Sequence, residues 1–282
     1  MEIYLTTEHA YALTPQFNLD TAHDRIEQKK MNLVAGMLGS LLSRAKPEEL
    51  QLTTTENRLE PFWLIKASSR TKYDRAATYT VTTTGKDAKS VTVLGQAVSL
   101  ISQPKGEPTF KLTAIEHCLQ ELRIQQTFDG LTGTKVDFQK YANFARVEIS
   151  DLSTFNPEGI LLIPPQVRAT AVVRQATTEV VQPVKNAQAI HEERVDIETI
   201  DLNFRPVYAF EYEWVTKKKK VIIEFDALTG EIRTGGKKWN DQIKGIITRD
   251  FLFDVTADAI GTIVPGGSIA VKLVKAVVDR NK

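Results

Sequence analysis

The chain contains very little cysteine, with Cys118 as the single example among 282 residues. One cysteine excludes an intrachain disulfide, and it excludes a cysteine-based zinc site built by this chain alone. This cysteine usage fits a reducing compartment. The first 13 residues also lack the basic segment and the long apolar run of a secretory signal. We therefore expect a cytoplasmic protein.

The chain also lacks net charge and a long uninterrupted apolar run. Its 36 Lys and Arg residues nearly balance 35 Asp and Glu residues, which leaves a formal net charge of +1. This balance removes any whole-molecule argument for binding nucleic acid or an acidic membrane. The most apolar stretch, residues 251–278, is interrupted by four charged residues and falls short of the ~18 apolar residues of a membrane-spanning helix.

Motifs of catalysis and metal binding are missing as well. The sequence has no nucleophile elbow, phosphate-binding loop or dinucleotide-binding glycine pattern. Its four histidines share no metal-ligand spacing: His9, His23, His117 and His191. Cys118 follows one of them on a segment expected to be helical, where neighbouring side chains diverge by roughly 100°. We expect no catalytic residue, no metal and no cofactor, and keep an unrecognised hydrolase as an alternative.

The composition is that of an ordinary globular protein. Hydrophobic residues make up 42% and charged residues 25% of the chain, which is typical of a chain that folds around a core. The length suits two domains of roughly 100 to 150 residues each. We expect an α+β protein of two similar halves, residues 1–140 and 141–282, each an antiparallel sheet covered by helices.

The expected elements of the first half follow from residue spacing. Residues 20–44 carry apolar side chains at helical intervals after a capping Asp. Four β-favouring segments between residues 51 and 96, separated by polar residues and glycines, predict an antiparallel meander. Residues 112–126 repeat apolar side chains every three or four positions, which predicts an amphipathic helix. The segment over residues 128–138 predicts a loop or tight hairpin.

The second half is expected to begin with strands at residues 145–149 and 160–163. Two prolines then precede an expected helix over residues 168–181. A strand at residues 191–202 leads into a hairpin, and the tail from Trp239 is expected to be mostly helical. The tail helices carry apolar and small residues and could lie in a membrane interface or associate with the tails of other copies of the chain. Alternatively, they could cover a face of the sheet.

The most distinctive feature is a row of aromatic rings on alternate residues. A period of two places all four rings on one face of a strand: Tyr208, Phe210, Tyr212 and Trp214. The returning strand supplies three apolar side chains for the same face, namely Val221, Ile223 and Phe225. The pattern predicts a β-hairpin whose aromatic face belongs to the core.

A segment earlier in the chain is similar in sequence to this hairpin. Residues 58–85 align without a gap on residues 203–230, so that Pro61 meets Pro206 and Gly85 meets Gly230, both at an offset of 145. This similarity predicts an internal duplication. The apolar positions of the second strands differ by one in register, so a chance likeness of two hairpins stays open.

The turn of the hairpin carries a recognisable pattern. An Asp can accept backbone hydrogen bonds across such a turn, and a Gly can supply a positive φ. The matching residues are Asp226, Ala227, Thr229, Gly230 and Glu231. Through them, residues 208–232 resemble the terminal hairpin of PepSY-type domains. That resemblance implies a small binding or regulatory module rather than a catalyst.

The tip of the hairpin is the candidate interaction surface. It combines the two aromatic residues nearest the turn with a cluster of lysines: Tyr212, Trp214, Lys217, Lys218, Lys219, Lys220, Lys237 and Lys238. Such a basic tip could contact phosphate or lipid headgroups. The alternative is a solubilising loop above a buried aromatic face.

These features favour a non-catalytic component that binds, assembles or regulates other proteins. The expected partner is another protein or further copies of the chain as a homo-oligomer, and no nucleic acid is expected. The alternative is a peripheral membrane protein that uses the tail helices and the basic tip.

Overall fold

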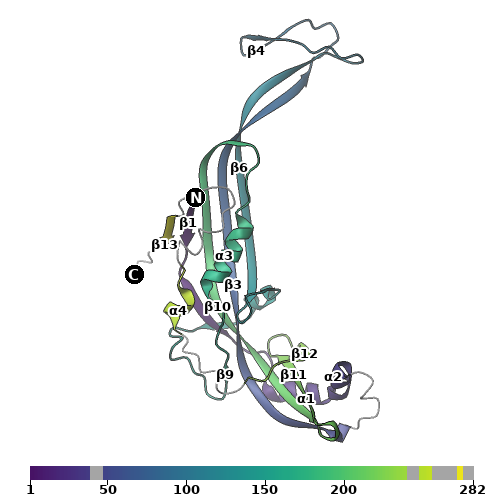
Figure 1. Ribbon diagram of the computed structural model, residues 1–282, viewed down its shortest axis with the longest axis vertical. Coiled ribbons are helices and arrows are strands. Elements are labelled where there is room, and N and C mark those ends of the chain that lie inside the picture. The colour runs from purple at the N-terminus through teal and green to yellow at the C-terminus, as the bar shows by residue number, and fades with distance from the viewer. Residues whose placement is uncertain (39–46, 240–247, 256–271, 276–282) are drawn as a thin grey trace.

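The computed structural model describes residues 1–38, 47–239, 248–255 and 272–275. Three very long strands form its spine: β3 (Leu50–Thr82), β6 (Thr109–Asp129) and β10 (Ala187–Trp214). β3 lies between the other two and pairs antiparallel with both. The molecule is accordingly elongated along these strands (Figure 1).

Shorter strands complete one mixed sheet around this spine. The second edge of β10 is occupied in turn by parallel β1 (Glu2–Leu5), parallel β2 (Glu8–Leu13) and antiparallel β11 (Lys219–Asp226). The remaining strands of this sheet each extend one of these: β7 (Lys135–Val136) on β6, β8 (Arg146–Glu148) on β2, β9 (Leu161–Leu162) on β3, β12 (Ile232–Thr234) on β11 and β13 (Lys272–Lys275) on β1. A separate small hairpin joins β4 (Val91–Val93) to β5 (Gln96–Val98).

The helices of the described chain are few and short. α1 (Leu19–Glu27) begins at Asn18, whose side chain accepts a hydrogen bond from the Thr21 amide, so Asn18 and not Asp20 is its cap. α2 (Lys30–Leu38) follows it, α3 (Ala169–Val180) covers the middle of the sheet, and α4 (Arg249–Phe253) is a single turn. Three 3₁₀ turns complete the set: η2 (Pro47–Glu49), η3 (Gln139–Asn143) and η4 (Val215–Lys217).

The expected architecture of two helix-covered halves is wrong. β3 comes from the first half of the chain and β10 from the second, yet they are neighbouring strands paired from Leu50–Trp214 to Arg75–Ala187. The central sheet is therefore shared by both halves of the chain. The protein is mostly β, with few and short helices. Pairing between the halves leaves no local trace in the sequence, which is why residue spacing did not reveal it.

Two further expectations for the first half are wrong. Most of the expected meander is the single strand β3, which runs through the polar residues 66–78 without turning, and only residues 91–98 form a hairpin. The expected helix over residues 112–126 is part of strand β6. The second error arises because the apolar side chains of β6 lie on both faces of the strand and do not alternate strictly with polar ones.

The helical tail is also wrong where the structure describes it. α4 has five residues, and residues 272–275, expected to be helical, form strand β13 beside β1. The other expected helical positions of the tail, 240–247, 256–271 and 276–282, lie outside the described residues, as does the end of the first expected helix at 39–44.

The aromatic hairpin and the burial of its aromatic face are confirmed. Tyr208 pairs with Phe225 and Tyr212 with Val221 across β10 and β11. All four rings of the row are at most 5% exposed, and α1 covers them through Ala22 and Ile26. The helix expected over residues 168–181 is confirmed as α3, and the strands expected near residues 145–149 and 160–163 are confirmed as β8 and β9.

The β3–β6 and β10–β11 hairpins are each followed by a turn, and the two turns have the same geometry. Asp129 ends β6 and Asp226 ends β11, and each Oδ1 accepts the backbone N–H groups two and three residues later, at 2.8 Å for both in the first turn and at 2.9 and 3.0 Å in the second. Four residues after each Asp, Gly133 and Gly230 have φ of +72° and +74°, a region that favours glycine. The expected roles of Asp226 and Gly230 are thereby confirmed.

The segments before α1 and α3 dock on these turns in the same way. In each, two consecutive N–H groups donate to the carbonyl of the residue after the Asp: Gln16 and Phe17 to Ala227, and Gln166 and Val167 to Gly130. The second carbonyl of each segment then accepts a bond from an aromatic side chain, 3.0 Å in both cases: Tyr208 to Phe17 and Trp63 to Val167. The contacts of one hairpin are therefore repeated at the other.

These contacts define two equivalent units. The first is β2–α1–β3–β6–β7 and the second is β9–α3–β10–β11–β12. Each unit's helix packs on the hairpin of the other unit, because α1 covers β10 and β11 while α3 covers β3 and β6. The parallel strands follow the same rule, since β2 pairs with β10 and β9 pairs with β3.

One large difference separates the two units. In the second unit the hairpin turns after the pair Trp214–Lys219. Equivalent residues of β3 and β10 differ by 145 in residue number, and equivalent residues of β6 and β11 differ by 97, the difference between Asp226 and Asp129. The pair in the first unit that corresponds to Trp214–Lys219 is therefore Ser69–Leu122, and these two residues are paired. There the strands continue. We call residues 70–121 the arm, and Figure 1 shows it projecting at the top of the molecule, away from the helices.

Candidate functional site

Exposed apolar side chains gather on the arm. Twelve large apolar side chains are exposed in the described part of the chain, and six of them belong to these 52 residues: Tyr79, Val81, Leu94, Ile101, Ile115 and Leu119. Leu94, at the β4–β5 turn, is 98% exposed and Ile115 is 59% exposed. Clustered exposed apolar residues mark interaction surfaces more often than scattered ones do.

The arm becomes thinner toward its tip. Up to Arg75 its two strands are joined by the start of β10 as a third strand. Beyond that point, residues 76–82 pair only with residues 109–115 among the described strands, and no described helix covers either face. Both faces of this ribbon therefore meet solvent.

Three side chains fasten the base of the arm across its three strands. Asp74 of β3 contacts His117 of β6 at 2.7 Å and His191 of β10 at 2.8 Å. The hydrogen bond from His117, followed by that from His191, holds the pKa of Asp74 below its ordinary value. His191 lies at a β-bulge between Ile190 and Glu192, and a bulge redirects a side chain in this way.

A second polar cluster lies on the opposite face. The Tyr79 hydroxyl donates to Glu116, and Arg75 Nε donates to the same carboxylate at 2.7 Å. The bond from Tyr79 and then that from Arg75 lower the pKa of Glu116. The first cluster ties β3 to β6 and β10, and the second ties β3 to β6 again.

The aromatic part of the expected interaction surface is wrong. Tyr212 is 1% exposed and Trp214 is 4% exposed. Their polar atoms face inward as well, because Tyr212 donates to Glu27 at 2.6 Å and Trp214 donates to Glu49 at 2.9 Å. Both acceptors belong to the helical segments that cover the hairpin, which the period-two pattern alone could not place.

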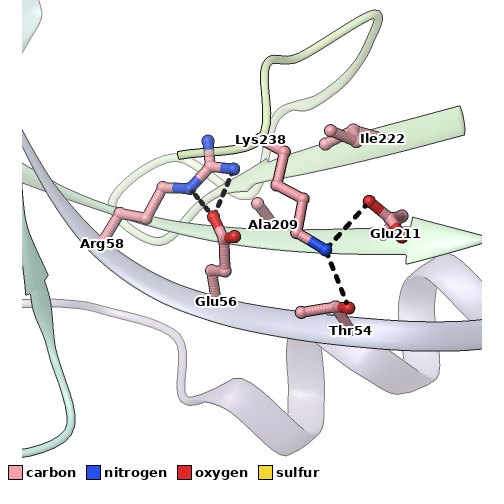
Figure 2. Close-up of a pocket in the computed structure, with 7 residues that line it drawn as sticks. All are labelled: Thr54, Glu56, Arg58, Ala209, Glu211, Ile222 and Lys238. Carbon is pink, nitrogen blue, oxygen red and sulfur yellow. Dashed lines mark hydrogen bonds and ion pairs between the residues drawn. The ribbon is translucent and has the colours of Figure 1, made fainter. Parts of the chain in front are cut away.

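The lysines of the expected surface are divided among different roles. Lys220 and Lys238 converge on the Glu211 carboxylate at 2.8 and 3.3 Å, and Figure 2 shows Lys238 between Glu211 and Thr54. Lys237 offers its backbone carbonyl to Arg58. Lys218 and Lys219 are exposed at the turn, and Lys217 ends η4. Since two of the lysines share the carboxylate of Glu211, the basic tip is smaller than the sequence predicted.

The hollow drawn in Figure 2 is too small for a substrate. It lies between Glu56, Arg58, Glu211 and Lys238, and its volume is about 10 Å³, which is on the order of one water molecule. Arg58 is 1% exposed and is enclosed by the carboxylates of Glu56, Glu60 and Glu224. These residues form a buried ionic network of the sheet.

The arm was not recognised from the sequence, although one signal could have revealed it. The strings FDGLTG at residues 128–133 and FDALTG at residues 225–230 differ at a single position. Aligning these two strings makes β6 the equivalent of β11. The alignment of residues 58–85 with residues 203–230 had instead placed residues 73–82 opposite β11. The difference between the two offsets, 145 and 97, shows that the first hairpin is 48 residues longer than the second.

Comparisons with other proteins give no relative. No protein-family model, curated protein or solved structure matches the chain. Within the described residues, no helix is both long and apolar enough to cross a membrane, and no group of three or more His, Cys, Asp or Glu side chains could hold a metal ion.

Proposed function

We propose that the protein is a non-catalytic, cytoplasmic component that binds or assembles with other proteins through the arm. The observation that carries this proposal is the contrast between the two units. They share their turns, docking contacts and strand pairing, and the first alone extends its hairpin by the arm, which exposes six large apolar side chains. A feature added to one copy of a shared framework is a candidate for a separate role.

The physical state of the ribbon supports the same role. A two-stranded ribbon without a covering layer is only marginally stable in water. Its outer strands also present unpaired backbone N–H and C=O groups, which favour pairing with another chain. Residues 76–82 and 109–115 are such a ribbon. A bound partner would cover the apolar side chains and satisfy those groups.

The charge of the arm favours a protein partner over a polyanion. Residues 70–121 contain seven Lys and Arg residues and five Asp and Glu residues. Arg75, Asp74 and Glu116 are already engaged within the arm. Nucleic-acid surfaces carry a stronger and more uniform positive charge. The PepSY-like hairpin adds support, since such hairpins belong to binding and regulatory modules.

Site-specific photo-cross-linking in the cells that produce the protein tests this function. A benzoylphenylalanine at Ile115 should yield cross-linked adducts, because this position is 59% exposed on the arm. The matched control carries the same probe at Val147, which is 65% exposed on β8, away from the arm. Adducts confined to the Ile115 probe support the proposal. No adducts, or equal adducts at both positions, contradict it.

A further inference from the structure

The outer edge of β6 is open over most of its length. β6 pairs with β3 along its full 21 residues. In the described chain its other edge is paired at Thr127 and Phe128 by β7 and at Thr109 by a bridge to Ile101. The side chain of Gln139 bonds the Gln125 carbonyl and closes the lower end of this edge. Residues 110–124 therefore present an unpaired edge.

This edge has few of the features that normally prevent strand pairing. The β3–β6 register runs from Phe62–Asp129 to Thr82–Thr109 without a bulge, whereas the β3–β10 register has four irregularities. β6 contains no proline, and between residues 112 and 122 it contains no lysine. Bulges, prolines and edge lysines are the usual protections. A long, regular edge without them is a template for another strand.

We propose that β6 pairs with β6 of a second copy of the chain, antiparallel and centred on Leu119. This inference rests on the proposed function and names its partner. A two-fold axis at Leu119 places residues 114–124 of one copy against residues 124–114 of the other. That segment ends where Gln139 begins to occupy the edge. The sheets of the two copies become continuous through it.

The order of the side chains is complementary to itself about this centre. Leu119, 52% exposed, faces Leu119 of the second copy. His117 faces Glu121 of the second copy on the same side of the sheet, and this contact occurs twice. Asp74 already holds His117 by Nδ1, which leaves the other ring nitrogen for the incoming carboxylate. Opposite polar or charged partners and paired apolar residues stabilise cross-strand contacts.

Neighbouring centres are less favourable. An axis at Glu116 or at Glu121 would set each of these carboxylates directly against its own copy, and like charges directly opposite are destabilising. An axis at His117 would set Lys111 against Arg123, and an axis at Cys118 sets no charged residue against a complementary one. Among the centres from Glu116 to Glu121, Leu119 is therefore the one that sets His117 against Glu121 and no like charges against each other, which favours a second copy as the occupant.

Sedimentation of the purified full-length chain gives the first test. The wild-type protein should have twice the monomer mass of 31.6 kDa. Leu119→Lys should return it to the monomer, because it places two ammonium groups opposite each other. Val147→Lys, at a strand position outside the arm that is 65% exposed, should remain dimeric. Circular dichroism of each variant verifies that it is folded.

Cysteine cross-linking in a Cys118→Ser background then tests the register. Leu119→Cys should form a disulfide-linked dimer. His117→Cys and Glu121→Cys should each fail alone but cross-link when mixed, because identical positions lie about 14 Å apart along the strands and a disulfide needs Cα atoms within about 7 Å. Val147→Cys is the control for random collision.

The outcomes separate this inference from the proposed function. A dimer with the expected cross-links supports it. A wild-type monomer, or a dimer that cross-links through other positions, overturns it. In either of these cases, adducts from the Ile115 photo-probe with a different protein would still support the proposed function, whereas their absence would remove both.

Discussion

Arg205 Nη2 lies 2.5 Å from Glu60 Oε2, and the two residues occupy equivalent positions of the two units, since 60 + 145 = 205. They pair directly across β3 and β10, and the flanking pairs Leu59–Pro206 and Pro61–Phe204 are related by the same offset. A local two-fold axis therefore passes between Glu60 and Arg205. The ion pair joins the units at the position where their symmetry is centred.

Arg205→Met should strongly destabilise the protein. The guanidinium also contacts Asp226 at 3.2 Å, so its loss leaves the carboxylates of Glu60 and Asp226 buried without this counter-ion. Removing one partner of a buried ion pair costs about 3 to 5 kcal/mol. Urea denaturation measures the loss. Arg233→Met, which breaks an exposed pair with Glu231, should cost less than about 1 kcal/mol, and equal losses would contradict this account.

The two Asp turns provide a matched pair of variants. Asp129→Ala should cost about 1 to 2 kcal/mol, because it removes the acceptor of two backbone N–H groups. Asp226→Ala should cost about 3 kcal/mol or more, since this carboxylate also accepts from Tyr141 and pairs with Arg205. Thermal and urea unfolding compare them. A larger loss for Asp129→Ala would argue against the asymmetry.

The ion pairs of Glu211 with Lys220 and Lys238 predict a pH effect on stability, and Figure 2 shows the one with Lys238. The hydrogen bond from Lys220 is the main cause that lowers the pKa of Glu211 in the folded protein. Because the folded pKa lies below the unfolded value of about 4.3, the carboxylate stabilises the fold above that value. The contribution is lost as pH falls through the folded pKa.

Lys220→Met should therefore raise the pKa of Glu211 and weaken the acid dependence of stability in this window. A carbon-detected NMR titration of the Glu211 carboxyl measures the shift. Lys140→Met is the control, because Lys140 pairs with Glu231 and should leave the pKa of Glu211 unchanged. An unaltered Glu211 titration in Lys220→Met would contradict the assigned cause.

Asp74→Asn should loosen the base of the arm. The amide cannot replace the carboxylate that accepts from both His117 and His191. Amide hydrogen exchange should become faster in residues 187–193 and 114–120, and remain unchanged around the aromatic hairpin. Asp87→Asn, an exposed position toward the tip, should leave both regions unchanged. Equal exchange rates of these residues in the wild type and in Asp74→Asn would mean that other contacts hold the three strands together.

The sequence predicted structure well wherever one face of a strand is buried. The alternate rings of β10 and the apolar residues of β11 were correctly assigned to one buried face, because burial of one face imposes a period of two. In β6 apolar side chains lie on both faces, with Leu122 on one and Ile115 and Leu119 on the other, so that period is obscured. The spacing of Ile115, Leu119 and Leu122 then fitted a helix equally well, and the long-range pairing with β3 decided for a strand.

The candidate site was missed for the same reason. Its residues belong to polar and weakly patterned segments, which local spacing interprets as loops or helices. The sequence similarity around Pro61 and Pro206 identified equivalent strands, but it continued into residues 73–82 because the interruption by the arm was not recognised. The one-residue mismatch in the second strands disappears when β6 takes that place. The duplication itself stays a prediction.

Replacement of the arm tests the central claim most directly. Residues 70–121 would be exchanged for the Val215–Lys218 sequence, which connects the equivalent pair in the second unit. Sedimentation velocity then compares this chain with the full-length protein over the same concentrations, with a cooperative unfolding curve as proof of folding. We expect the full-length chain to be a dimer and the replaced chain to be a folded monomer. A dimer that persists after replacement of the arm would contradict the arm as the element through which the protein associates.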